Sequence, residues 1–127
     1  MEPEKKDLNN EEEMSIEEIA EEMDRTREQT RCLKQLRTSK YELVWNRQFE
    51  ILSLTTFDLQ TLEKAELGGN SNLSQDQVKS AKDNVSMQIR HKEVDIQRAS
   101  FEITLLDSII IDLENRYVEL ERKTSHS

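Results

Sequence analysis

The feature that most limits the fold of this chain is an uninterrupted heptad repeat in its second half. From Val78 to Leu120, thirteen positions recur at alternating steps of four and three residues, and all but three of them are aliphatic. That spacing is typical of a coiled coil, because it places one stripe of side chains along one side of an α-helix. The thirteen positions are Val78, Lys82, Val85, Ile89, Lys92, Ile96, Ala99, Ile103, Leu106, Ile110, Leu113, Tyr117 and Leu120.

The rest of the chain also has few residues that can break a helix. Its 127 residues include only two glycines and one proline, whereas β-rich and α/β folds need many more turn residues. The sequence therefore predicts a single all-α domain, built from long helices.

The first helix has a clear predicted start. Ser15 and Glu18 have the spacing of a capping box, in which a hydroxyl and a carboxylate each accept a hydrogen bond from a free backbone amide. No helix breaker follows before the glycines, so we expect one helix over residues 15–67. Residues 1–14 are acidic and lack periodicity, and we expect them to form a disordered arm.

A turn and a second capping box follow. Two adjacent glycines begin a predicted turn over residues 68–73, because glycine readily adopts the left-handed conformation that ends helices. Ser74 and Gln77 form the next capping box, so a second helix is expected over 74–123, followed by a short tail over 124–127. Two helices of equal length joined by a short turn predict an antiparallel hairpin.

Charge gives an independent prediction of the hairpin register over the domain 15–123. Folding the chain about residue 71 places residue i beside residue 142 − i. Residues 25–47 contain seven bases and two acids, whereas the opposite segment 95–117 contains five acids and two bases. The complementary signs favour this register.

The first helix has a less regular apolar pattern. Residues from Ile16 to Leu33 fit one heptad register, and a second register begins at Tyr41. We expect the step between them, near Arg37, to be a stutter, which is an insertion of four residues that locally unwinds a supercoil. The second register consists of Tyr41, Trp45, Gln48, Leu52, Thr55, Leu59 and Leu62.

Two stretches of the chain are apolar over more than one side of a helix. In the predicted hairpin neither stretch faces the other, so both would stay partly exposed, and exposed patches of this kind mark protein interfaces. We therefore expect a second chain to complete a four-helix bundle, and the Ile/Leu seam favours self-pairing in parallel. The predicted interface residues are Trp45, Phe49, Leu52, Leu54, Phe57, Phe101, Leu105, Leu106, Ile109, Ile110 and Leu113.

The charge of the chain limits its partners. The formal net charge is −9, and residues 1–24 alone, with eleven acids and two bases, account for it. An acidic chain is a poor ligand for nucleic acid or anionic membranes. A basic stretch over 25–40 nevertheless provides Arg27, Arg31 and Lys34 as candidate contacts to an acidic partner, with intramolecular pairing as the simpler interpretation.

The sequence provides little for chemistry. Its two histidines, His91 and His126, lack the Glu-x-x-His spacing of a di-iron bundle, and Cys32 has no second cysteine for a metal site. We expect no catalysis, metal or cofactor. Without a visible signal peptide or apolar span, we expect an intracellular protein, cytoplasmic or nuclear.

These patterns predict a non-catalytic coiled-coil scaffold or adaptor subunit, which binds itself, other helical subunits, or both. Chains of this layout resemble, in type only, subunits of kinetochore, meiotic-chromosome, coactivator or vesicle-tethering complexes. One alternative is a helical co-chaperone or assembly factor that binds a client protein. A weaker alternative is a nucleic-acid-binding helical dimer that uses the 25–40 stretch. A swapped dimer with unbent helices also remains open.

Overall fold

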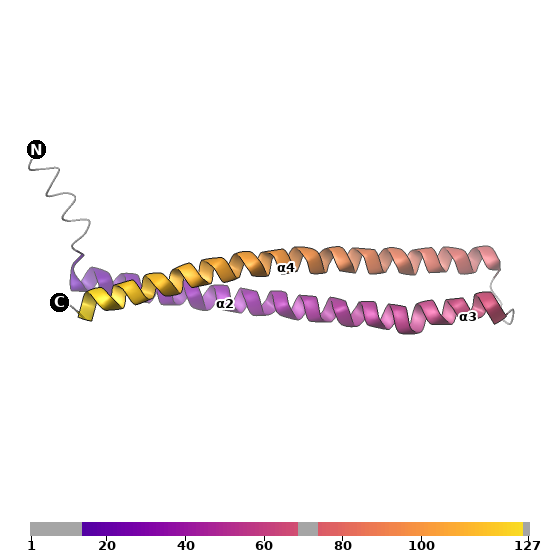
Figure 1. Ribbon diagram of the computed structural model, residues 1–127, viewed down its shortest axis with the longest axis horizontal. Coiled ribbons are helices and arrows are strands. Elements are labelled where there is room, and N and C mark those ends of the chain that lie inside the picture. Colours follow the sequence, from indigo (N-terminus) through magenta and orange to yellow (C-terminus); the bar gives the residue numbers. More distant parts are fainter. Residues whose placement is uncertain (1–13, 69–73, 126–127) are drawn as a thin grey trace, which may run out of the picture. The chain divides into compact units, whose positions relative to one another are not determined.

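The computed structural model describes residues 14–68 and 74–125, and these residues are almost entirely helical (Figure 1). Helix α2 spans Ile16–Ser53, and the π-helical segment η1 follows at Leu54–Leu59. Helix α3 spans Gln60–Gly68, and helix α4 spans Gln75–Ser125. The all-α prediction is confirmed for the described part of the chain, which contains no strand.

Some of the predicted segments fall outside the described residues. These are the acidic arm apart from Met14, the turn apart from Gly68, and the last two residues of the tail. Gly68 is the final residue of α3 rather than part of a turn. Helix α4 continues two residues beyond the predicted end, to Ser125.

Both predicted helix starts carry serine caps. The backbone amide of Glu18 donates to Ser15 Oγ at 3.1 Å. At the start of α4 the box is reciprocal, because the Gln77 amide donates to Ser74 Oγ at 3.1 Å and the Ser74 amide donates to Gln77 Oε1 at 2.8 Å. These bonds satisfy amides that the first turn of a helix leaves without intrahelical partners.

The chain divides into two compact units. Unit 1 combines Met1–Leu36 with Leu105–Ser127, and in it the first part of α2 packs antiparallel against the last part of α4. Its most deeply buried side chains are Thr26, Ile110 and Leu120, exposed by 1%, 2% and 0%. Ile19 and Leu106 are also buried in this core.

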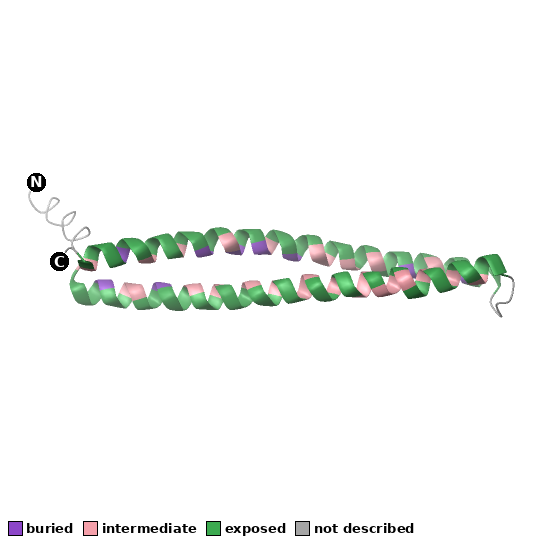
Figure 2. Cartoon of the chain, turned by 60° about the horizontal axis from the view of Figure 1, so that its bottom comes forward, coloured by how far each residue is buried: buried purple, intermediate pink, exposed green. Residues whose placement is uncertain are grey.

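Unit 2 covers Arg37–Thr104, so the rest of α2, with η1 and α3, packs against the first part of α4. The buried apolar residues of this unit all belong to α4 and are Val78, Val85, Ala99 and Ile103. The facing side chains of the N-terminal helices are only half-buried. Figure 2 shows the buried and half-buried residues on the inner sides of the paired helices, with exposed residues on the outer sides.

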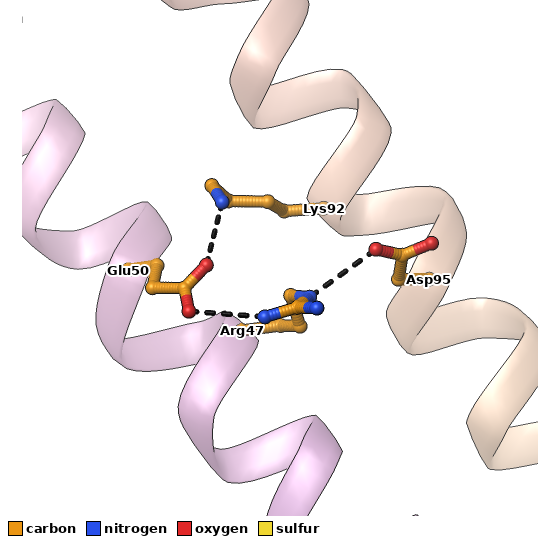
Figure 3. A network of polar contacts seen from close by, with 4 residues as sticks. All are labelled: Arg47, Glu50, Lys92 and Asp95. Atoms are coloured by element: carbon orange, nitrogen blue, oxygen red, sulfur yellow. Dashed lines mark hydrogen bonds and ion pairs between the residues drawn. The ribbon is translucent and has the colours of Figure 1, made fainter.

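Ion pairs fix the register within unit 2. Lys40 Nζ lies 2.6 Å from Glu102, and a connected network joins Arg47 to Asp95 at 3.2 Å and Lys92 to Glu50 at 2.5 Å (Figure 3). In all three pairs the two residue numbers add up to 142. These three pairs agree with the register predicted from charge over residues 40–50 and 92–102, whereas the pair of Lys82 with Glu66, beyond the π-helical segment, adds up to 148.

The seam of α4 agrees with the heptad prediction. All thirteen predicted positions from Val78 to Leu120 are buried or half-buried. They face the N-terminal helix of the same chain within each unit, so this seam is occupied without a second chain. The two seam lysines are neutralised by acids of the N-terminal helices, Lys82 by Glu66 at 2.9 Å and Lys92 by Glu50.

The seam of α2 differs from the prediction, because it has no stutter at Arg37. Buried or half-buried residues continue at steps of four and three from Ile19 through Arg37 to Leu54. The interruption comes later, where the next seam residue after Leu54 is Leu59, five residues on and at the end of the π-helical segment. A π-helical turn holds one residue more than an α-helical turn, which explains the step of five.

Candidate partner-binding surface

A row of large apolar side chains lies exposed on the N-terminal helices of unit 2. We call it the aromatic stripe, and it consists of Tyr41, Trp45, Phe49, Leu52 and Phe57, exposed by 53%, 70%, 65%, 61% and 66%. The first four belong to α2, and Phe57 belongs to η1. Large apolar side chains that are exposed in a continuous row mark a surface that other molecules cover.

The aromatic stripe lies beside the hairpin seam and runs along the helix in the same direction. Tyr41, Trp45 and Leu52 each come one residue after a seam residue, and one residue turns the chain by about 100° around the helix axis. The seam residues Lys40, Val44 and Ile51, for example, are half-buried, while their C-terminal neighbours are exposed. The N-terminal helix of unit 2 therefore has two apolar faces, of which only one packs against α4.

The π-helical segment keeps the stripe continuous. The steps along the stripe are four, four and three residues within α2 and then five residues from Leu52 to Phe57. The seam makes the same step of five, from Leu54 to Leu59. One extra residue in the π turn therefore shifts both faces together, and Phe57 stays on the side of Leu52.

The surroundings of the stripe carry little charge. Between residues 41 and 57, all of which are described, Glu42 is the only exposed charged residue. The other two charged residues, Arg47 and Glu50, are half-buried and pair with α4. Hydrogen bonding from Lys92, with the nearby charge of Arg47, lowers the pKa of Glu50, so this carboxylate is held on the hairpin side. A surface with so little charge suits an apolar partner.

Helix α4 also exposes apolar side chains. In unit 2 these are Met87, Val94 and Phe101, exposed by 61%, 45% and 65%. In unit 1 they are Leu105, Ile109, Ile111 and Val118, each close to half exposed. In unit 1 a shallow groove also runs between the helices, where Cys32 and Leu33 of α2 approach Ile109 and Leu113 of α4.

Four of the predicted interface residues are less accessible than expected. Leu106 and Ile110 are buried in the core of unit 1, exposed by 8% and 2%, because they lie on the seam that faces α2. Leu54 and Leu113 are half-buried. The remaining predicted residues are exposed, so they can meet a partner without any opening of the helix pair.

The basic residues predicted to contact an acidic partner have partners within unit 1. Lys34 Nζ lies 3.2 Å from Glu114, and Arg31 bonds Glu28 in its own helix. The Arg27 guanidinium donates a hydrogen bond to the Tyr117 hydroxyl, and its central carbon lies 5.2 Å from the centre of the Tyr117 ring. This hydrogen bond raises the pKa of Arg27. Intramolecular pairing therefore accounts for these three side chains.

The described residues offer no cluster of metal-ligating side chains. No group of three or more His, Cys, Asp or Glu among residues 14–68 and 74–125 could hold a metal ion. His91 and the thiol of Cys32 are exposed. None of the described helices is long and apolar enough to cross a membrane.

The exposed apolar residues that were not among the predicted interface residues are Ile16, Leu36, Tyr41, Leu67, Met87, Val94, Ile111 and Val118. Tyr41 was assigned to the seam because it fits a heptad with Trp45 and Leu52. Its members Tyr41, Trp45 and Leu52 lie on the exposed aromatic stripe, whereas Leu59 and Leu62 are half-buried. The charged seam residues Lys40 and Arg47, which pair with acids of α4, were the signal for the correct face.

Comparison with known proteins adds no assignment, since no family model, curated protein or solved structure matches this chain.

Proposed function

We propose that this chain is a non-catalytic scaffold or adaptor subunit that holds a protein assembly together by binding helices of other chains. Its working surface in this proposal is the exposed apolar side of its helices, above all the aromatic stripe. The proposal keeps the interpretation that a second chain completes a helical bundle, but assigns the contact to the outward faces instead of the α4 seam.

The observation that carries the proposal is the exposure of the stripe. Trp45 is 70% exposed and Phe49 is 65% exposed, one helical turn apart. Tryptophan and tyrosine are enriched among the residues that dominate binding energy at protein interfaces. The stripe contains one of each, Trp45 and Tyr41, and all five of its side chains are more than half exposed in their own unit, which supports binding as their function.

The spacing of the stripe supports a helix as the partner. Side chains at steps of four, four and three residues form a straight row along α2, and a second helix can pack its own apolar row against such a row. Helix-in-groove recognition uses anchors with this spacing. An extended strand has no free sheet edge to join among the described residues, all of which lie in helices or at their ends.

We also propose an intracellular location, in the cytoplasm or nucleus. Cys32, the only cysteine of the chain, is an exposed thiol. A free exposed thiol suits a reducing compartment, because disulfides persist mainly in oxidising ones.

The experiment uses photo-cross-linking in cells that express the full chain. A photoreactive phenylalanine analogue replaces Trp45 in one variant and His91, an exposed polar position of α4, in the control variant. We expect recurrent adducts to defined protein chains, identified by mass spectrometry, from position 45 and not from position 91. Equal adduct patterns from the two positions, or none from position 45, would overturn the proposal.

A further inference from the structure

We infer that the aromatic stripe is the self-association face of this chain, and that a second copy covers it with its own stripe running antiparallel. This inference rests on the proposed function and deepens it, because it names one partner for the surface. It also assigns the direction of the second copy, which the proposed function leaves open.

The layout of the stripe is nearly symmetric about Phe49. Tyr41 lies eight residues before Phe49 and Phe57 lies eight residues after it, while Trp45 and Leu52 lie four before and three after. A two-fold interface requires a patch that complements itself. An axis at Phe49 places each Tyr41 beside Phe57 of the second copy and each Trp45 beside Leu52. Pairing a large side chain with a smaller one fills the space between helices well.

Charged side chains lie only at the ends of the antiparallel pair. Glu42 is the only exposed charged residue between positions 41 and 57. In the antiparallel pair it lies opposite Thr55 and Thr56, which are uncharged, with the exposed Asp58 two residues further along. The large side chains at the centre of the contact therefore meet no exposed charge.

The exposed area of the stripe reaches what a specific dimer needs. At about 200 Å² for each aromatic side chain, the exposed fractions of Tyr41, Trp45, Phe49 and Phe57 amount to about 500 Å² per copy. Two copies would bury about 1,000 Å² from these residues alone, which is the lower bound for a specific interface. Leu52 and the uncharged side chains beside the stripe add to it. We therefore expect a reversible dimer whose population depends on concentration.

Net charge does not oppose this contact. Residues 37–104 contain nine bases and ten acids, so unit 2 carries a formal charge of only −1. The −9 of the whole chain is contributed by residues 1–24, none of which belongs to unit 2. Two copies can therefore bring their unit 2 surfaces together without strong repulsion.

The first experiment compares two matched variants of the full chain. Phe49 and Phe101 are both 65% exposed in unit 2, but only Phe49 belongs to the stripe. Sedimentation equilibrium over a concentration series gives the dimer dissociation constant, and circular dichroism checks that the helices remain. We expect Phe49→Ser to raise the dissociation constant by at least about thirtyfold, as for an interface hot spot, and Phe101→Ser to leave it within about twofold. A wild-type chain that remains at 15.0 kDa at every concentration, or equal effects of both variants, would overturn the inference.

The second experiment tests the direction with disulfide cross-linking in a Cys32→Ser background. We mix the Glu42→Cys and Thr55→Cys variants under mild oxidation. The antiparallel dimer predicts mixed disulfides between the two variants and little cross-linking of Glu42→Cys with itself. Predominant self-cross-linking of Glu42→Cys would overturn the antiparallel arrangement.

The two proposals can fail separately. If the purified chain remains a monomer while position 45 cross-links to a different protein in cells, the second copy is the wrong occupant and the proposed function stands. If position 45 yields no defined adduct and the chain is a monomer, both proposals fail.

Discussion

Three consecutive isoleucines in unit 1 allow the assignment of the faces of α4 to be tested with one chemical change. Ile109, Ile110 and Ile111 are exposed by 47%, 2% and 56%. Replacement by alanine removes three carbon atoms, worth about 0.8 kcal/mol each when fully buried, or about 2.4 kcal/mol in total. Scaling by buried fraction gives a loss of about 2.4 kcal/mol for Ile110→Ala, about 1.3 for Ile109→Ala and about 1.1 for Ile111→Ala.

Two further effects sharpen the comparison. The cavity left in the core adds to the cost at Ile110 only, because the other two side chains already face water. Alanine is a better helix former than isoleucine, but that gain is the same at all three positions and cancels in the differences. We therefore expect Ile110→Ala to cost at least about 1 kcal/mol more than either neighbour.

Urea unfolding of the full chain, followed by circular dichroism, measures these differences. All variants are compared at one fixed protein concentration, because association stabilises the folded state by mass action. If Ile109→Ala or Ile111→Ala lowered the free energy of unfolding as much as Ile110→Ala, the assignment of inner and outer faces in unit 1 would be refuted.

Three more predictions concern unit 2 and its helix ends. Because ion pairing lowers the pKa of Glu50, its carboxylate stabilises the fold above its unfolded pKa, and this contribution is lost as the pH falls through the folded pKa. The difference in urea midpoint between wild type and Glu50→Gln should therefore be present at about pH 7 and should shrink as the pH falls below the unfolded pKa of about 4.3. Ser74→Ala should cost about 1 kcal/mol of unfolding free energy by removing the hydroxyl of the α4 cap, and an unchanged urea midpoint would contradict this role. Deletion of Thr55 should leave the melting temperature unchanged or higher, because it restores α-helical steps in both the seam and the stripe. Deletion of Thr38, which lies in regular α-helix, should lower the melting temperature. Equal losses of melting temperature in the two deletion variants would contradict the π-helical insertion.

The α4 half of the fold could be predicted from sequence because its seam is made of aliphatic residues. Ten of its thirteen positions are Val, Ile, Leu or Ala, and hydrophobic periodicity finds such a seam directly. The serine caps were also predictable, because a capping box has a fixed spacing of residue types. The antiparallel register followed from complementary charge, which three ion pairs between residues 40–50 and 92–102 reproduce.

The first helix was harder to interpret because hydrophobicity and packing point to different faces. Arg37, Lys40 and Arg47 lie on the seam of α2, where a search for apolar residues overlooks them. Tyr41 and Trp45 are the more hydrophobic residues, but they lie one position further round the helix and face outward. The predicted stutter at Arg37 came from joining the true seam before it to the exposed stripe after it.

The π-helical segment has no comparable sequence signal. Leu54–Leu59 contains neither glycine nor proline, and its residues fit an α-helix as well as a π-helix. The extra residue becomes visible only when burial is known, because the seam then takes a step of five residues. The composition of the candidate surface was therefore predictable from sequence, while its position around the helix was not.

The single tryptophan of the chain provides the most direct test of the central claim, which is that the aromatic stripe is open in one chain and covered by a second. Trp45 fluorescence is measured over a concentration series of the full chain, with a soluble quencher added at each step. We expect a solvent-exposed, strongly quenched tryptophan at the lowest concentrations, and a blue-shifted, protected one as the molar mass doubles. A tryptophan protected even in the monomer would contradict the exposed stripe, and one that stays quenched as the chain dimerises would contradict its role as the self-association face.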